Sequence, residues 1–189
     1  MDVAENLNPG LFGKIVKKAR SHVDESGVGN VKVACDLYRL VRRKVDYAEY
    51  ANFRHPPREC LERGGNCVDT TCLFCSLLIR AGFECRMTSV SFQDRGHMFT
   101  EVLIRGSYEE LHDDIVDYYT DRQFLGGINT ASMDSGKPGC RWVIADPATS
   151  DFFGDTTGLR ELGYIRNSAE TGDGPQWIGD TDRYRIHFG

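Results

Sequence analysis

Apolar residues recur at helical spacing near the start of the chain. Leu11 and Ile15 lie one turn apart with basic residues between them, which predicts an amphipathic helix over about residues 9–24. Asn30, a residue type that often caps helices, precedes valines and leucines at the same spacing, so a second helix is expected to end near residue 44. Both helices are expected to pack on the rest of the domain through their apolar faces.

The central part of the chain carries a different pattern. After a turn at Pro56 and Pro57, residues 58–62 are expected to form one or two helical turns. The segment after Asn66 is apolar nearly all round until Gly82, a residue type that commonly ends helices. This pattern is typical of a central helix that is buried on all sides.

Three later segments are rich in β-branched, aromatic and alternating residues, which favours β-strands. They cover about residues 83–92, 98–104 and 141–145, and turn residues at 93–96 join the first two. Alternating residues at 183–188 predict a closing strand. The sequence therefore predicts the α+β class, with N-terminal helices and a buried helix packed on a small antiparallel β-sheet.

The remaining segments predict how the chain is organised. Residues 105–140 form a long insert between two strands, with an acidic helix followed by a loop rich in Gly and Ser. No repeat, linker or second domain is visible. We therefore expect residues 1–189 to form a single domain, with its core at about 45–150 and a loop-like C-terminal extension at 151–189.

Composition narrows the function classes. The chain has 189 residues, with 28 acidic and 23 basic side chains and a formal charge of −5, and this mild acidity argues against a nucleic-acid-binding protein. No secretory signal is visible, and no apolar segment approaches the roughly 20 residues that cross a bilayer, so we expect a cytoplasmic location and no membrane partner. Seven cysteines, an odd number, fit reduced thiols better than a secreted disulfide framework.

One cysteine lies where its chemistry would change. If Asn66 caps the buried helix, Cys67 lies in the first turn and Asp69 is the third helical residue. Unpaired backbone N–H groups and the positive end of the helix dipole stabilise a thiolate there and can face a developing oxyanion. Gly64 and Gly65 are expected to leave room for a substrate acyl group. A structural helix that happens to begin with a cysteine is the alternative interpretation.

A nucleophilic cysteine needs a base and a group that orients the base. His97 opens an apolar strand, so sheet pairing would hold its ring in a rigid position. Asp146 ends a strand just before Pro147, where its carboxylate can orient an imidazole. Each residue taken singly is more often structural, but the combination predicts a catalytic triad of Cys67, His97 and Asp146.

The order of these three residues is part of a longer pattern. Gly65 precedes the cysteine by two positions, and Trp142 precedes the aspartate by four. Further matching positions are Asp69, Phe99, Glu101, Pro147, the lead-in 57–65 and the helix tail 78–82. Together they resemble the transglutaminase-like superfamily over about residues 45–150.

The resemblance implies a papain-like core, in which a nucleophile at a helix N-terminus packs against an antiparallel sheet that carries the histidine and the aspartate. Cys67 would attack a peptide or carboxamide carbonyl, His97 would transfer the proton and Asp146 would fix the tautomer, and water or an amine would then resolve a thioester. Hydrolysis of a peptide or protein substrate, with no metal or cofactor, is the expected activity. Transglutaminase-type amine transfer and a catalytically silent binding module are the alternatives. The residues expected to contact substrate are Gly65, Asn66 and Trp142.

Several polar side chains have open roles. The side-chain donor of the oxyanion hole is not identified, and the candidates are Tyr47, Tyr50, Asn52 and His55. His187 is a second candidate for the base, and His112, which lies beside two aspartates, is expected to be a solvated helix residue. The insert 105–140, which contains Tyr118 and Tyr119, is expected to border the cleft and help select substrate.

An iron–sulfur protein is the strongest interpretation from another class. Cys67, Cys72 and Cys75 have the C-x4-C-x2-C spacing of plant-type ferredoxins, with Cys85 or Cys140 as a fourth ligand. Cluster loops are irregular, whereas this stretch is predicted to be a buried helix, so Cys72 and Cys75 are expected to be small core residues. A zinc site from the same cysteines would lack a second paired motif.

Overall fold

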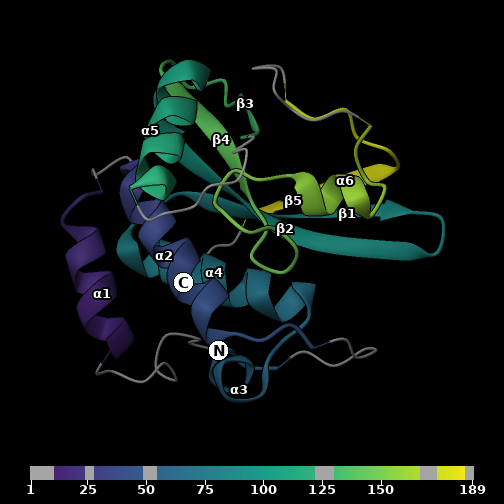
Figure 1. The fold of residues 1–189 in the computed structure, drawn as a ribbon, viewed down its shortest axis with the longest axis horizontal. Helices are drawn as coiled ribbons and strands as arrows, with labels where there is room; N and C mark the ends of the chain where they lie inside the picture. Colours follow the sequence, from purple (N-terminus) through teal and green to yellow (C-terminus); the bar gives the residue numbers. More distant parts are fainter. Residues whose placement is uncertain (1–10, 24–27, 49–54, 122–129, 167–173, 186–189) are drawn as a thin grey trace.

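The computed structural model describes residues 11–23, 28–48, 55–121, 130–166 and 174–185. The helices in these ranges are α1 (Leu11–Arg20), α2 (Val31–Lys44), α3 (Pro57–Arg63), α4 (Cys67–Ala81), α5 (Tyr108–Thr120) and α6 (Thr157–Glu161) (Figure 1). The first five confirm the predicted helices, whereas α6 lies in a segment that was expected to be loop-like. A membrane-spanning helix is absent from the described ranges.

The strands form one antiparallel sheet with the order β3-β4-β2-β1-β5. Their bounds are β1 (Cys85–Phe92), β2 (Arg95–Arg105), β3 (Ser132–Asp134), β4 (Cys140–Ala145) and β5 (Asp180–Arg185). β3 was not predicted, since three residues are too few to show an alternating pattern. The turn between β1 and β2 is shorter than predicted, because Gln93 adopts a φ of 58° and lets Arg95 pair with Phe92. The closing strand begins before its predicted start, and residues 186–188 lie outside the described ranges.

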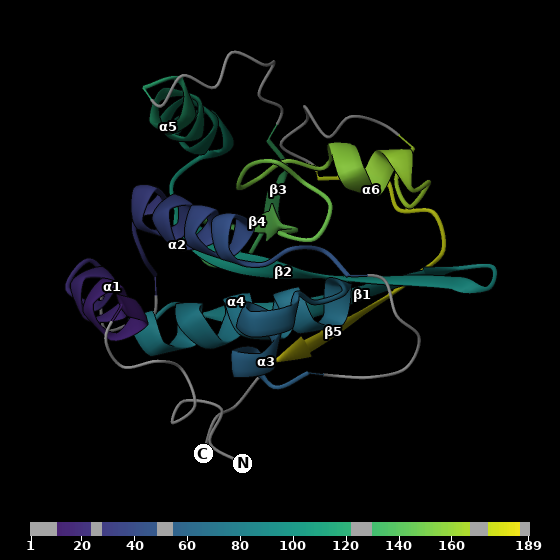
Figure 2. The same ribbon diagram turned by 60° about the horizontal axis from the view of Figure 1, so that its bottom comes forward.

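The two faces of the sheet are covered by different parts of the chain (Figure 2). On one face α4 packs against β1 and β2, and α1, α2 and α3 contact α4 in turn. Val102 and Val143 point into this larger core. On the opposite face, Leu159 of α6 packs with Phe99 and Ile144. The fold is therefore the expected α+β arrangement, with a buried helix against an antiparallel sheet.

The insert between β2 and β4 belongs to the core. Leu111 and Ile115 of α5 are buried with residues of α2, and β3 pairs with β4. The Tyr118 hydroxyl donates to Asp36 of α2, and the Tyr119 hydroxyl accepts the Phe153 N–H at 2.9 Å. These two tyrosines are only 3% and 4% exposed, so they are core residues, and the expectation that the insert borders a cleft stays a prediction.

Candidate active site

A capping box fixes the start of α4. The Asn66 side chain accepts the N–H groups of Val68 and Asp69 at 3.0 and 3.2 Å, and the Asp69 carboxylate accepts the Asn66 N–H at 3.3 Å. Asn66 itself is extended, with φ −80° and ψ −173°, so the helix begins at Cys67. This reciprocal pairing is the local reason that the thiol lies on the first helical residue.

The backbone at Cys67 keeps a donor available. Asn66 satisfies the next two N–H groups of the helix, but within the described parts of the chain the N–H of Cys67 has no acceptor. This N–H and the positive end of the α4 dipole lie beside the sulfur. A donor in this position can bind a negatively charged oxygen that forms on an acyl group attached to the thiol.

The glycines before Cys67 serve the chain itself. A Cβ on Gly65 would lie 2.6 Å from the Cys60 sulfur and 2.8 Å from the Asp69 Cβ. Gly65 also exchanges hydrogen bonds with a neighbouring segment, donating to the Asp46 carbonyl at 3.0 Å and accepting the Ala48 N–H at 3.1 Å. A side chain at position 65 would therefore clash with protein atoms, which explains the glycine there. Asn66 uses its side chain as the helix cap, and the expectation that Gly65 and Asn66 contact substrate stays a prediction.

His97 and Asp146 meet at the end of β4. His97 pairs with Val90 inside the β1–β2 hairpin, and β4 pairs with β2 only as far as Thr100. Asp146, the first residue after β4, therefore lies beside the His97 end of β2. His97 Nε2 and Asp146 Oδ2 are 2.7 Å apart, and both side chains are buried.

The Asp146 carboxylate is held by the chain that follows it. The Ala148 N–H donates to Oδ1 at 3.1 Å, and the Thr149 hydroxyl donates to Oδ2 at 2.5 Å. Together with His97, these donors satisfy a carboxylate that is completely buried. Thr149 lies outside the motif that the sequence analysis singled out.

Cys67 completes the arrangement. Its side chain is hydrogen-bonded to His97, and the Met98 N–H also donates to the sulfur. Because His97 Nε2 is bonded to Asp146, Nδ1 is the ring nitrogen left for the sulfur. The structure thus brings together all three residues of the predicted triad, from α4, β2 and the end of β4.

The electrostatics of the three residues favour a charged pair. Burial raises the pKa of Cys67, but the hydrogen bond and positive charge of His97 outweigh burial, so the thiol pKa is lowered. Burial alone would lower the pKa of His97, but the charge and hydrogen bond of Asp146 raise it to about 10. Burial raises the pKa of Asp146, and His97 more than offsets this, so the carboxylate pKa is lowered. These directions describe a thiolate beside an imidazolium.

A tyrosine that the sequence analysis did not single out covers the imidazole. Tyr164 stacks on His97, with ring centroids 5.9 Å apart and planes 20° from parallel. Its backbone is anchored on both sides, since its N–H donates to the Leu159 carbonyl at 2.9 Å and its carbonyl accepts the Ile178 N–H at 2.8 Å. Tyr164 follows α6 in a segment without a helix or strand pattern, so the local sequence did not predict that this side chain would contact His97.

Trp142 lies away from these residues. It pairs with Leu103, six positions along β2 from His97, which corresponds to about 20 Å in a strand. Its indole is 5% exposed and lies under the Arg86 guanidinium, 4.1 Å from the ring centroid. This position gives no support to the expectation that Trp142 contacts substrate.

The remaining polar candidates are distributed as follows. Tyr47 is half-exposed and bridges to Gly65, while Tyr50, Asn52 and His187 lie outside the described ranges. The His55 ring nitrogen Nδ1 is 3.0 Å from the Glu59 carboxylate, and the His55 backbone N–H donates to the Asp69 carboxylate at 2.8 Å. The residue therefore contacts both α3 and the first turn of α4. His112 Nδ1 is 3.0 Å from the Thr130 hydroxyl.

The other cysteines of α4 occupy a different setting. The Cys72 sulfur is 3.9 Å from the Met87 sulfur, and the Cys75 sulfur is 3.3 Å from the Thr100 hydroxyl. On the neighbouring helix α3, desolvation by burial raises the pKa of Cys60 to about 12. All seven cysteines are free, and the described residues contain no group of three His, Cys, Asp or Glu side chains arranged to hold a metal ion.

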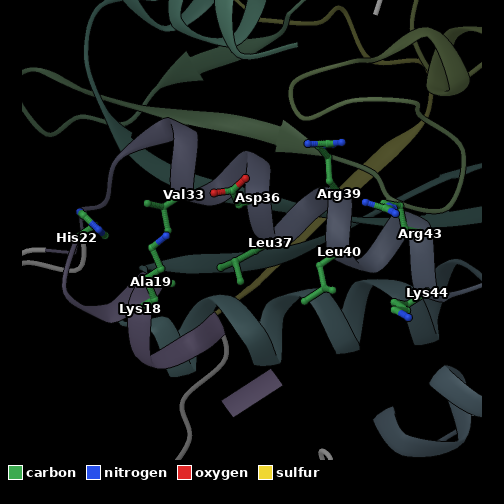
Figure 3. Close-up of a pocket in the computed structure, with 10 residues that line it drawn as sticks. All are labelled: Lys18, Ala19, His22, Val33, Asp36, Leu37, Arg39, Leu40, Arg43 and Lys44. Carbon is green, nitrogen blue, oxygen red and sulfur yellow. The ribbon is translucent and has the colours of Figure 1, made fainter. Parts of the chain in front are cut away.

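A separate hollow of about 600 Å³ lies along α2 (Figure 3). Apolar side chains of α1 and α2 contribute to its lining together with the basic residues Lys18, His22, Arg39, Arg43 and Lys44. Several of these cations occupy the last turns of α1 and α2, where a positive charge stabilises the helix dipole. None of the three triad residues lines this hollow.

Comparisons with known proteins identify the family. The model of the transglutaminase-like superfamily matches residues 21–147, about two thirds of the chain. A search of curated proteins finds no match. Among solved structures, one called "Putative Cysteine Protease", from Cytophaga hutchinsonii, shares 15% identity at a TM-score of 0.39. That alignment covers 93% of this chain and 50% of the other, so this chain spans half the length of that protein. By the family match, the chain belongs to the transglutaminase-like superfamily.

Proposed function

We propose that this protein is a cysteine-dependent acyl-transfer enzyme in which Cys67 is the nucleophile, His97 the general acid and base, and Asp146 the residue that orients His97. One observation carries the proposal: a single imidazole is hydrogen-bonded to both a thiol at a helix N-terminus and a buried carboxylate. This is the arrangement that an activated nucleophile requires. The lowered pKa of Cys67 supports it, because the thiolate is the reactive form.

The first half of the reaction forms a thioester. The Cys67 thiolate attacks an amide carbonyl, and the negative charge moves to the oxygen, where the Cys67 N–H can stabilise it. The His97 imidazolium gives its proton to the leaving nitrogen, the C–N bond breaks, and the acyl group remains on the sulfur. Asp146 keeps the imidazole oriented through its 2.7 Å hydrogen bond to Nε2.

The second half releases the acyl group. Neutral His97 takes a proton from an attacking water, the C–S bond breaks, and a carboxylic acid leaves as the thiolate and imidazolium are restored. We propose peptide or protein amides as substrates and hydrolysis as the outcome, since water needs no binding site of its own. An amine in place of water would give transglutaminase-type transfer by the same steps.

The experiment that tests the proposal is a screen of peptide amides with intact-protein mass spectrometry, on wild type and on Cys67→Ala. The expected result is an acyl adduct on Cys67 and release of product, both absent from the variant. Adding a primary amine would show whether water or the amine takes the acyl group. If no substrate leaves an adduct or product that depends on Cys67, the silent binding module becomes the better description.

A further inference from the structure

Helix α2 contacts the loop that carries Asp146. The Tyr38 hydroxyl lies 2.8 Å from the Asp146 carbonyl oxygen and 2.8 Å from the Ser150 carbonyl oxygen. Tyr38 is completely buried, and its ring makes edge contacts with Phe74 and Phe153. A residue 108 positions earlier in the chain thus contacts both ends of the turn that follows β4.

Arg42 adds a second contact one helical turn later. Its guanidinium donates to the Pro147 carbonyl at 3.3 Å and to the Asp151 carboxylate at 3.1 Å. Residues four apart lie on the same side of a helix, so Tyr38 and Arg42 face the loop together. Neither residue lines the hollow along α2 (Figure 3), so these contacts belong to a different surface of the helix.

The contacts from α2 act on the main chain of the loop. The Asp146 carboxylate is already bonded to His97, Thr149 and the Ala148 N–H. The backbone carbonyl of Asp146 accepts the Ser150 N–H at 3.0 Å, and this bond closes the turn. Tyr38 therefore fixes where this turn lies relative to α2 and α4, while the local bonds fix its internal shape.

We propose that Tyr38 is a positioning residue for Asp146, assisted by Arg42, so that α2 sets the orientation of the carboxylate that holds His97. The proposal rests on the proposed function, in which Asp146 and His97 act together. Displacement of the loop by a fraction of an ångström would lengthen a hydrogen bond that is 2.7 Å in the intact site. The imidazole would then lose part of the attraction that keeps it protonated.

Tyr38→Phe is the variant that isolates this contact, because it removes the hydroxyl and keeps the ring contacts. Tyr119→Phe is the matched control. Tyr119 is also buried, and its hydroxyl accepts a backbone group, the Phe153 N–H, which lies beyond the Asp146–Ser150 turn that Tyr38 contacts. Both variants lose a buried hydrogen bond, so both are expected to unfold at a lower temperature. Only the first should change the active site.

The readout is the titration of the His97 imidazole, followed by nitrogen-15 NMR on the full chain. Among the residues that the structure describes, the charged or titratable side chains that face His97 are Asp146 and Cys67, with Tyr164 stacked on the ring. None of these is altered by the variants. We expect Tyr38→Phe to lower the titration midpoint by at least one pH unit, a tenfold loss of proton affinity, and Tyr119→Phe to leave it unchanged. A Tyr38→Phe midpoint equal to wild type, or an equal shift in Tyr119→Phe, would overturn the proposal.

Arg42→Gln gives a second route if Tyr38→Phe does not fold. Its side chain is partly exposed, so the variant is expected to fold and to shift the midpoint in the same direction by a smaller amount. An unchanged midpoint in this variant, with Tyr38→Phe unfolded, would contradict the proposal. Alkylation of Cys67 separates the two claims: an unreactive Cys67 in wild type refutes the proposed function, whereas a reactive Cys67 with an unshifted Tyr38→Phe midpoint refutes the positioning role alone.

Discussion

Cys67 and Cys72 lie on the same helix and are both half-buried, but their surroundings differ. Cys67 is the first residue of α4 and is hydrogen-bonded to His97 and to the Met98 N–H. Cys72 lies more than one turn later, with its sulfur beside Met87. Since the two thiols are similarly exposed, the contacts with His97 and the Met98 N–H are what lower the pKa of Cys67.

Removing the His97 imidazole should abolish the difference in reactivity between Cys67 and Cys72. In His97→Ala, Cys67 loses the hydrogen bond and the positive charge that lower its pKa, so its alkylation at pH 7 should slow about thirtyfold, toward the rate of a cysteine with an ordinary pKa of about 8.5. Quantitative mass spectrometry of both cysteines provides the measurement, with Cys72 as the internal control. Equal alkylation rates for Cys67 in the variant and the wild type would show that His97 does not activate this thiol.

Neutralising the carboxylate should have the next largest effect. In Asp146→Asn, the amide oxygen can still accept the Ala148 N–H, but the NH2 group that replaces Oδ2 accepts no bond from Thr149 or His97 and the side chain carries no charge, so the pKa of His97 should fall from about 10 toward its ordinary 6.5. The thiolate then faces a mostly neutral ring at pH 7.5, and we expect about a tenfold slower alkylation of Cys67. An unchanged rate, with the fold intact by circular dichroism, would show that Asp146 acts only as a turn residue.

Removing the thiol should expose a pH dependence of stability. A raised His97 pKa stabilises the folded state below pH 6.5, and this contribution is lost as the pH rises toward 10. The lowered Cys67 pKa has the opposite effect, because it stabilises the folded state increasingly as the pH rises toward the ordinary thiol pKa of about 8.5. The two contributions offset each other in wild type between pH 7 and 8.5.

In Cys67→Ala only the histidine contribution remains. The free energy of unfolding should therefore fall with pH over this range, by up to about 1.4 kcal/mol per unit, while wild type stays nearly flat. Urea denaturation at several pH values measures both curves. Parallel curves for the two proteins would mean that Cys67 and His97 do not share a proton as described.

The smallest effect on the alkylation rate is expected from Tyr164, whose ring stacks on His97. Tyr164→Leu keeps an apolar side chain over His97 but removes the stacked ring, so we expect about a threefold slower alkylation of Cys67. Tyr164→Phe, which retains the ring, is the matched control and should react at the wild-type rate. A loss in Tyr164→Phe as large as in Tyr164→Leu would assign the effect to the hydroxyl instead.

Local patterns were enough to predict that Cys67 lies in the first turn of α4. Asn66 and Asp69 form the capping box within one turn, so the start of α4 could be predicted from adjacent residues. His97 and Asp146 could be predicted because each lies at a recognisable strand boundary and because their order resembles a family pattern. The prediction that residues 1–189 form a single domain remains a prediction.

Contacts between distant segments could not be predicted. Tyr38 reaches the Asp146 loop across 108 positions, and Tyr164 reaches His97 from a segment with no periodic pattern. The need for a glycine at position 65 also could not be predicted, since only the folded chain brings Cys60 and Asp69 against this residue. Periodicity indicates which residues are buried, but not which distant residue each one meets.

The pH dependence of iodoacetamide labelling in wild type, with each modified cysteine located by mass spectrometry, measures directly whether Cys67 is an activated thiol. We expect Cys67 to be labelled rapidly well below pH 8.5 and far ahead of Cys72 and the other five cysteines. Labelling of Cys67 that rises only near pH 8.5, at the rate of Cys72, would contradict this expectation and leave a family fold without an activated thiol.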